Sequence, residues 1–160
     1  APSWVEGVSC MDSNICIDDK SRYSAALHLY ENAVQSVSET VGLFHNKPTV
    51  IFCANMACYN SFGFNKSSGR AVGKSGIVIS QRGWKPYYVR HEMIHHRQAE
   101  EPGVFAALFK PEWLIEGMAY SLSHDPRNTL SARWQQARSK FNSWLREVGE
   151  DNLWEEARKL

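Results

Sequence analysis

A pattern of the form His-Glu-x-x-His occurs in the middle of the chain, at His91, Glu92 and His95. On a helix, two histidines four positions apart lie on one face a turn apart, so both imidazoles can reach the same metal ion. Glu92 lies one step round the helix from His91. From there its carboxylate can take a proton from a water on the ion without ligating the ion itself. The pattern predicts a zinc-dependent hydrolase with Glu92 as the general base.

A third metal ligand is needed, because the short pattern alone arises by chance about two times in a hundred in a chain of this composition. A catalytic zinc ion usually has three protein ligands and one open position for water. Glu116 can supply the third ligand. Twenty residues lie between His95 and Glu116, and they include a break at Pro102-Gly103, so a second helix can fold back over the first.

The segment that carries Glu116 has the form Trp-Leu-x-Glu-Gly-x-Ala, at residues 113–119. Together with the His-Glu-x-x-His pattern it resembles the gluzincin clan of zinc metallopeptidases. The segment is similar to the third-ligand helix of the clan's aminopeptidase branch and of many small domains of the peptidase MA type. The resemblance covers residues 91–120.

The resemblance implies a small zincin-like metallopeptidase domain. In such a domain Glu92 acts as base and then as acid, and Gly117 lets the two site helices approach closely. The strand expected at residues 76–80 takes the place of the edge strand of the clan's substrate cleft. The implied zinc ligands are His91, His95 and Glu116.

Two departures from the clan leave the activity more open than the metal site. The aminopeptidase branch has a Gly- and Met-rich recognition motif with an acidic anchor for the substrate's amino group, and neither is found here. An endopeptidase or another specialised hydrolase is therefore at least as good a reading. In the thermolysin branch an Asp one turn after the third ligand orients the first His. The corresponding residue here is Tyr120, a weaker acceptor.

Hydrolysis of an amide also needs a donor for the oxyanion of the tetrahedral intermediate. Tyr120 and His124 follow Glu116 at four-residue steps along one helix face, and we name both as candidate catalytic residues. An ordinary place on the helix surface is the alternative for each of them. The further candidates are Tyr87, Tyr88 and Arg127.

Other signals near the motif have simpler interpretations. Residues 68–75 resemble a phosphate-binding loop, but a strand is expected after them where that loop requires a helix, so they are better described as a rim of the cleft. His96 lies about 100° round the helix from His95 and is expected at the surface or in support of a ligand. Arg90 and Arg97 are expected to be solvated.

The elements that must position these residues follow from hydrophobic periodicity and turn signals. Residues 1–20 are expected to be irregular and residues 60–76 to form a long loop or an irregular hairpin. The expected strands cover 49–53 and 76–80, and the expected helices cover 21–44, 87–98, 104–109, 111–124 and 129–148. Asn152 and Glu155 predict a capping box for a last short helix. The fold class is α+β, a single domain over residues 1–160 with a short mixed β-sheet and a long C-terminal helix.

Four cysteines, Cys10, Cys16, Cys53 and Cys58, form two pairs close in sequence, and the simplest of the three possible pairings joins 10 to 16 and 53 to 58. Disulfides, together with a start that lacks Met, predict a mature periplasmic or secreted protein.

The overall charge and hydropathy indicate the class of partner. The formal net charge of +1 gives no indication of a nucleic-acid partner. The sequence contains no run of about 18 apolar residues, so no membrane span is predicted. The expected partner is a peptide or protein substrate. The alternatives are a non-catalytic zincin-like binding or regulatory module and a zinc hydrolase of a non-peptide amide.

Overall fold

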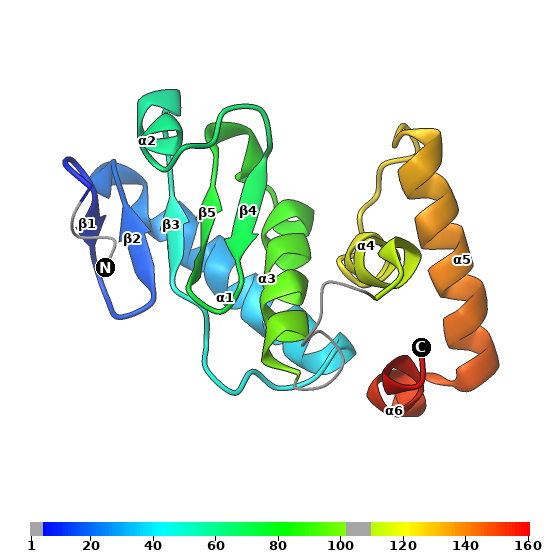
Figure 1. Ribbon diagram of the computed structural model, residues 1–160. Coiled ribbons are helices and arrows are strands. Elements are labelled where there is room, and N and C mark those ends of the chain that lie inside the picture. The colour runs from blue at the N-terminus through cyan, green and yellow to red at the C-terminus, as the bar shows by residue number, and fades with distance from the viewer. Residues whose placement is uncertain (1–4, 102–109) are drawn as a thin grey trace.

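A mixed β-sheet forms one side of the computed structural model, which describes residues 5–101 and 110–160 (Figure 1). The strands follow the order β1-β2-β3-β5-β4 across the sheet. β2, β3 and β5 run parallel, and β1 and β4 pair antiparallel at the two edges. The strands are β1 (Ser9–Cys10), β2 (Ile15–Ile17), β3 (Val50–Phe52), β4 (Gly69–Val72) and β5 (Gly76–Ile79).

The helices are α1 (Tyr23–Thr40), α2 (Met56–Ser61), α3 (Pro86–Glu100), α4 (Glu112–Leu122), α5 (Ala132–Val148) and α6 (Leu153–Arg158). Helix α1 packs on α3 and β2, and α3 lies between the edge strand β4 and helix α4 (Figure 1). Helix α5 covers α4 on the side away from the sheet (Figure 1). The predicted α+β class is confirmed, and the two site helices are neighbours.

The central strands are buried on both faces, which is why they appear in the sequence as continuous apolar runs. Alternate residues point to opposite faces. The odd-numbered strand residues Ile15, Ile17, Ile77 and Ile79 lie in the main core with the apolar face of α1. The residues between these isoleucines, Cys16 and Val78, belong to a smaller cluster with Cys53, Cys58 and Tyr59. The strands expected around residues 49–53 and 76–80 are confirmed within one or two residues.

Both disulfides are present with the simplest pairing, Cys10–Cys16 and Cys53–Cys58. The first joins β1 to β2, which lie in a segment that was expected to be irregular. The turn between them is closed by the Asp12 carboxylate, which accepts hydrogen bonds from two backbone N–H groups further along the turn. Within the predicted irregular segment 1–20, the described residues 5–20 are therefore more regular than their turn-rich composition indicates, because the disulfide and sheet pairing with β3 order them.

Strand β4 is the main correction to the expected fold. The segment 60–76, expected as a loop or an irregular hairpin, contains β4, which pairs with β5 from Gly69–Ile79 to Val72–Gly76. The edge of the sheet beside the site is thus β4, and β5 is an interior strand. The resemblance-based placement of the edge strand at 76–80 was wrong. The reason is that β4 lacks a run of β-branched residues and is formed by pairing with its neighbour.

The helix ends differ modestly from their predicted positions. Helix α1 is shorter than 21–44: the Asp19 side chain caps a 3₁₀ turn before it, and Gly42 follows it with a φ of +122°. Helix α5 ends at Gly149 as predicted. The capping box at the start of α6 is not formed, because Asn152 donates its side-chain amide back to the carbonyl of Val148.

The helix predicted at residues 104–109 lies outside the described residues. Across the part of the chain that is described, no helix has both the length and the apolar character needed to cross a membrane.

Candidate metal centre

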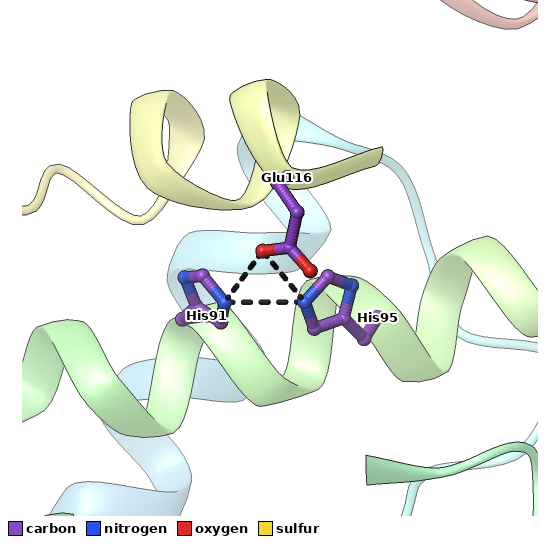
Figure 2. A group of neighbouring side chains, drawn as sticks. All are labelled: His91, His95 and Glu116. Atoms are coloured by element: carbon purple, nitrogen blue, oxygen red, sulfur yellow. Dashed lines mark hydrogen bonds and ion pairs between the residues drawn. The ribbon is translucent and has the colours of Figure 1, made fainter. Parts of the chain in front are cut away.

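The three predicted ligands converge on one point between α3 and α4 (Figure 2). The Nε2 atoms of His91 and His95 lie 3.1 Å apart. The Glu116 Oε2 atom lies 3.5 Å from the first and 3.6 Å from the second. The three candidate ligand atoms all lie within 4.8 Å of one another, so the group can hold a metal ion.

The charges around the cluster favour a bound cation. Burial opposes ionisation of Glu116, but hydrogen bonds from the two histidines outweigh it and hold the pKa of the carboxyl well below its usual range. Burial lowers the pKa of His95, yet Glu116 more than compensates and raises it to about 8. Without a metal the cluster therefore retains a proton between its nitrogen and oxygen atoms. A metal ion at this point would replace that proton.

Gln98, which the sequence analysis did not single out, supports His95 from behind. Its Oε1 lies 2.8 Å from Nδ1 of His95, and its Nε2 donates to the carbonyl of Ile115 across 3.0 Å. Because the amide nitrogen is used by Ile115, the oxygen faces the imidazole and the Nδ1 atom must donate. When His95 loses the second proton, the Nε2 lone pair is directed at the cluster, as a metal ligand requires.

Tyr120 lies against the first ligand. Its ring is edge-on to the imidazole of His91 at a centroid distance of 4.6 Å, and Trp134 backs it at 5.7 Å. No hydrogen bond joins Tyr120 to His91 within the described ranges, so the phenol packs on this ligand. Burial, with a smaller effect of the Glu116 charge, raises the pKa of Tyr120 to about 12. The hydroxyl therefore keeps its proton at neutral pH and can donate a hydrogen bond.

His124 does not join the site. His124 was expected to lie on the same helix face as Glu116 and Tyr120, but α4 ends at Leu122, before it. His124 follows the helix with a φ of 54°, is exposed, and is absent from the lining of the cavities at the centre. Sequence spacing alone could not place this helix end, since residues 118–123 contain no proline or glycine.

Glu92 faces the cleft beside the ligands and contacts the edge strand. Its Oε2 accepts a hydrogen bond of 2.8 Å from the backbone N–H of Ala71 in β4. A Cβ atom at Gly69 would lie only 2.8 Å from Cγ of Glu92, so β4 reaches this position only because residue 69 is glycine. The predicted base is thus positioned by a strand within residues 60–76, the segment expected to form a long loop or an irregular hairpin.

A cavity of about 430 Å³ opens over the three ligands, and a second of about 250 Å³ adjoins it. Both are lined by His91, Glu92 and Tyr120. Of the other oxyanion candidates, Tyr88 and Arg127 line the smaller cavity, and Tyr87 stacks on Tyr88 behind it. Part of the rim predicted at residues 68–75 is present, since Ser68 and Gly69 line the smaller cavity and Gly69, Arg70 and Ala71 line the larger one.

The remaining polar residues of α3 stabilise the fold. His96 is buried, 3.0 Å from the carbonyl of Asn46, and holds the loop after α1. Arg97 is also buried and pairs with Glu101 at 2.9 Å. The expectation that Arg97 and Arg90 are solvated was wrong: Arg97 is enclosed and the Nε atom of Arg90 is buried, because α3 is packed between α1, β4 and α4.

Gly117 allows a close approach of helices, although to a different partner from the one implied. A Cβ atom there would collide with the carbonyl oxygen of Ala137 and lie 2.7 Å from Cβ of Phe141, both in α5. The glycine therefore seats α4 on α5. Its role in placing Glu116 over α3 is indirect.

No family model, no curated protein and no solved structure matches this chain. The resemblance to the gluzincin clan stays a prediction, and the function is argued below from the geometry of the site.

Proposed function

We propose that this protein is a zinc-dependent hydrolase, and specifically a metallopeptidase that cleaves peptide bonds in the cleft between β4 and α4. The observation that carries the proposal is the convergence of His91, His95 and Glu116 with Glu92 beside them. Residues on two helices, separated by twenty positions in the chain, meet in the arrangement of a three-ligand metal site.

Zinc is the metal that this donor set favours. Two imidazole nitrogens and one carboxylate oxygen match catalytic zinc sites, which leave a further position open. Calcium and magnesium prefer ligand sets made of oxygen atoms. The cavity over the ligands offers room for water and substrate on the open side.

Glu92 is proposed as the proton carrier. Zinc bound here would lower the pKa of a coordinated water and polarise the substrate carbonyl. The Ala71 N–H holds one carboxylate oxygen of Glu92, and the other has no hydrogen bond to the described residues. That oxygen is available to accept a proton from water and to pass it to the leaving amine.

Tyr120 is the candidate donor to the oxyanion. It projects into both cavities beside His91, and its raised pKa keeps the phenol protonated. A neutral O–H donor next to the reacting carbonyl stabilises charge that develops only in the transition state. Arg127 lines only the smaller cavity, further along the cleft.

The edge strand supports a peptide as substrate. The N–H of Ala71 points away from β5 toward Glu92, so in this antiparallel pairing the backbone groups of Gly69 and Ala71 face the cleft. Glu92 uses the Ala71 N–H, and an extended peptide can add to such an edge through the remaining outward backbone groups of Gly69 and Ala71. Two disulfides are compatible with an extracytoplasmic location, and we propose a periplasmic or secreted enzyme.

Metal analysis tests the site. We expect one zinc ion per chain in the wild type and loss of zinc in His95→Ala and Glu116→Gln. Glu112→Gln is the matched control on α4, because Glu112 is exposed and pairs with Arg133 away from the cluster. Zinc retained by both ligand variants would exclude these residues as ligands.

Activity tests the chemistry. A peptide library incubated with the zinc-loaded protein is expected to be cleaved, and a chelator should stop cleavage. Glu92→Gln should keep its zinc and lose at least about 100-fold in kcat. Substantial residual turnover in that variant would contradict Glu92 as base. Zinc binding with no cleavage of any peptide would favour a non-catalytic module or a hydrolase of another amide.

A further inference from the structure

The smaller cavity beside Glu92 has a composition of its own. Three residues with cationic side chains line it, and among the described residues Glu92 is the only one in the lining that carries a carboxylate. Ser67, Ser68 and Tyr88, which carry hydroxyl groups, also line it. The cations come from three separate parts of the chain, namely Lys66, Arg82 and Arg127.

The wall that carries Lys66 is firmly held. The hydroxyls of Tyr59 and Ser67 lie 2.6 Å apart. Ser80 donates both its backbone N–H and its hydroxyl to the Ser68 carbonyl at 2.9 Å. The Arg82 guanidinium donates to the carbonyl of Lys66. A segment fixed at three consecutive residues holds the backbone of Lys66 in the cavity wall, with the Arg82 guanidinium against its carbonyl.

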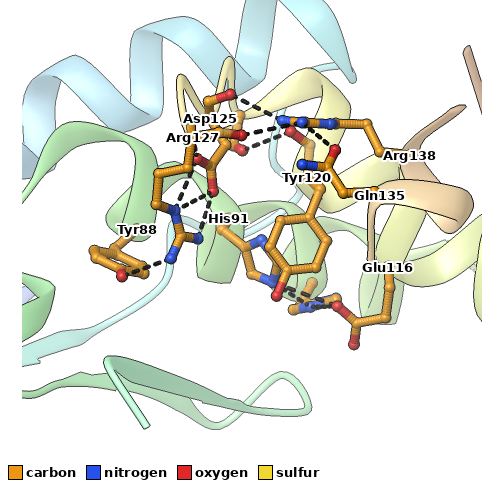
Figure 3. A network of polar contacts seen from close by, with 10 residues as sticks. Tyr88, His91, Glu116, Tyr120, Asp125, Arg127, Gln135 and Arg138 are labelled. Atoms are coloured by element: carbon orange, nitrogen blue, oxygen red, sulfur yellow. Dashed lines mark hydrogen bonds and ion pairs between the residues drawn. The ribbon is translucent and has the colours of Figure 1, made fainter. Parts of the chain in front are cut away.

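Arg127 is held by its own set of polar contacts (Figure 3). Asp125 accepts from its Nε and Nη2 atoms, with a shortest distance of 2.6 Å, and its Nη1 donates to the Tyr88 hydroxyl across 2.8 Å. Arg138 from α5 holds the carbonyls of Asp125 and Arg127 in turn. The guanidinium has more N–H donors than these contacts use, and the spare ones have no acceptor within the described ranges.

The charges of the residues that line the smaller cavity favour an anionic ligand. Asp125 offsets the charge of Arg127 but its side chain is buried and lies outside the cavity lining. Among the described residues that line the cavity, Glu92 alone carries a charge opposite to those of Lys66 and Arg82, and it also lines the cavity over the metal cluster. Arg127 then supplies directed donors, and the other two cations supply net positive charge.

We propose that this cavity binds a carboxylate of the substrate, so that the enzyme selects peptides with an acidic group next to the scissile bond. The proposal rests on the hydrolase function proposed above. The two cavities share Glu92 and His91, so a peptide with its reacting carbonyl over the cluster places a neighbouring group in the smaller one. The carboxylate can belong to an Asp or Glu side chain or to the C-terminus of the peptide.

Matched peptides separate these two sources. One series exchanges Glu for Gln at each position in turn, and a second exchanges the C-terminal acid for the amide. Cleavage is measured as kcat/KM with the wild type, and binding as Kd with zinc-loaded Glu92→Gln. We expect one carboxylate, in one series, to improve both quantities by about tenfold, since hydrogen bonds to charged groups are the stronger class.

Variants of the cavity then test the assignment. Lys66→Glu reverses one charge, and no hydrogen bond or ion pair of this side chain occurs in the described structure, so the fold should persist. We expect it to reduce the preference to about twofold or less. Lys74→Glu, in the exposed turn between β4 and β5, makes the same change away from both cavities and should retain the preference.

The outcomes distinguish this proposal from the proposed function. Peptides that are cleaved without any preference for a carboxylate would overturn the acidic specificity and leave the hydrolase intact. Carboxylate-dependent binding that Lys66→Glu removes, without cleavage of any peptide, would uphold the cavity and overturn the hydrolase. An equal loss of preference in Lys66→Glu and Lys74→Glu would also overturn the cavity assignment, because the effect would then be one of overall charge.

Discussion

The side chain of Gln98 on α3 contacts both helices of the metal centre, His95 on its own helix and the backbone of Ile115 on α4. Its side-chain oxygen lies 2.8 Å from Nδ1 of His95, and its amide nitrogen donates to Ile115, the residue before Glu116. One buried amide therefore contacts a ligand on α3 and the backbone next to a ligand on α4. Such support of a metal-bound imidazole sets its tautomer and its basicity.

Replacing Gln98 should weaken metal binding without removing a ligand. In Gln98→Leu the Nδ1–H of His95 loses its acceptor, and we expect zinc affinity to fall by about ten- to a hundredfold. Gln98→Glu keeps an acceptor for His95 but loses the donor to Ile115, so its zinc affinity should lie between those of the Leu variant and the wild type. Competition with a chromophoric chelator measures both values. An unchanged Kd in the Leu variant would show that the hydrogen bond does not tune the ligand.

The seating of α4 on α5 makes a second prediction at Gly117. A methyl group there meets the backbone of Ala137 and the Cβ atom of Phe141, which cannot move cheaply. We expect Gly117→Ala to lower the free energy of unfolding by about 1–3 kcal/mol, as overpacking does. Glu112→Ala, at an exposed position of the same helix, should stay within about 0.5 kcal/mol of the wild type. Urea denaturation measures both, and equal stabilities would refute the close contact.

Asp125 should contribute to stability in a pH-dependent way. Burial opposes its ionisation, but the hydrogen bonds from Arg127 prevail and hold the pKa of the carboxyl below its usual value of 3.8. A carboxyl whose pKa is lower in the folded state than in the unfolded state stabilises the folded protein, and the full effect is present at pH values above the unfolded-state pKa. That contribution is lost as pH falls below about 3.8 through the lower folded value.

Asp125→Asn therefore should cost about 2 kcal/mol near neutral pH, since it leaves a half-buried guanidinium without its partner. The difference from the wild type should shrink as the pH falls below the ordinary pKa of the carboxyl. Denaturant titrations at several pH values from neutral downward measure the difference. A difference that stays constant across this range would argue against ionisation of Asp125 as its source.

The Cys53–Cys58 disulfide should stabilise the smaller core cluster next to β3. It closes a short loop, for which the chain-entropy relation gives about 2 kcal/mol. We expect Cys53→Ala/Cys58→Ala to lose about that amount, and a reductant to have less effect on the double variant than on the wild type. Thermal unfolding with and without reductant tests this. If reductant changed neither protein, the bond would not contribute to stability.

Local patterns in the sequence were sufficient for the parts of the fold that depend on near neighbours. The β-branched runs indicated β3 and β5, and helical periodicity indicated α1, α3, α4 and α5. Both cysteine pairs are close in sequence, so their pairing was the simplest one. Local patterns did not predict strand β4, because its four residues gain their extended conformation from pairing with β5.

The sequence by itself determined that two histidines share a helix face with an acid beside them, and that a second helix offers Glu116. Helix geometry is a local property, so spacing was enough. Only the tertiary structure decided which other side chains reach the centre. It brought Gln98 behind His95, turned His124 away where α4 ends, and placed Arg127 in the neighbouring cavity. These placements depend on where helices stop and on contacts between distant segments, and no local spacing encodes either.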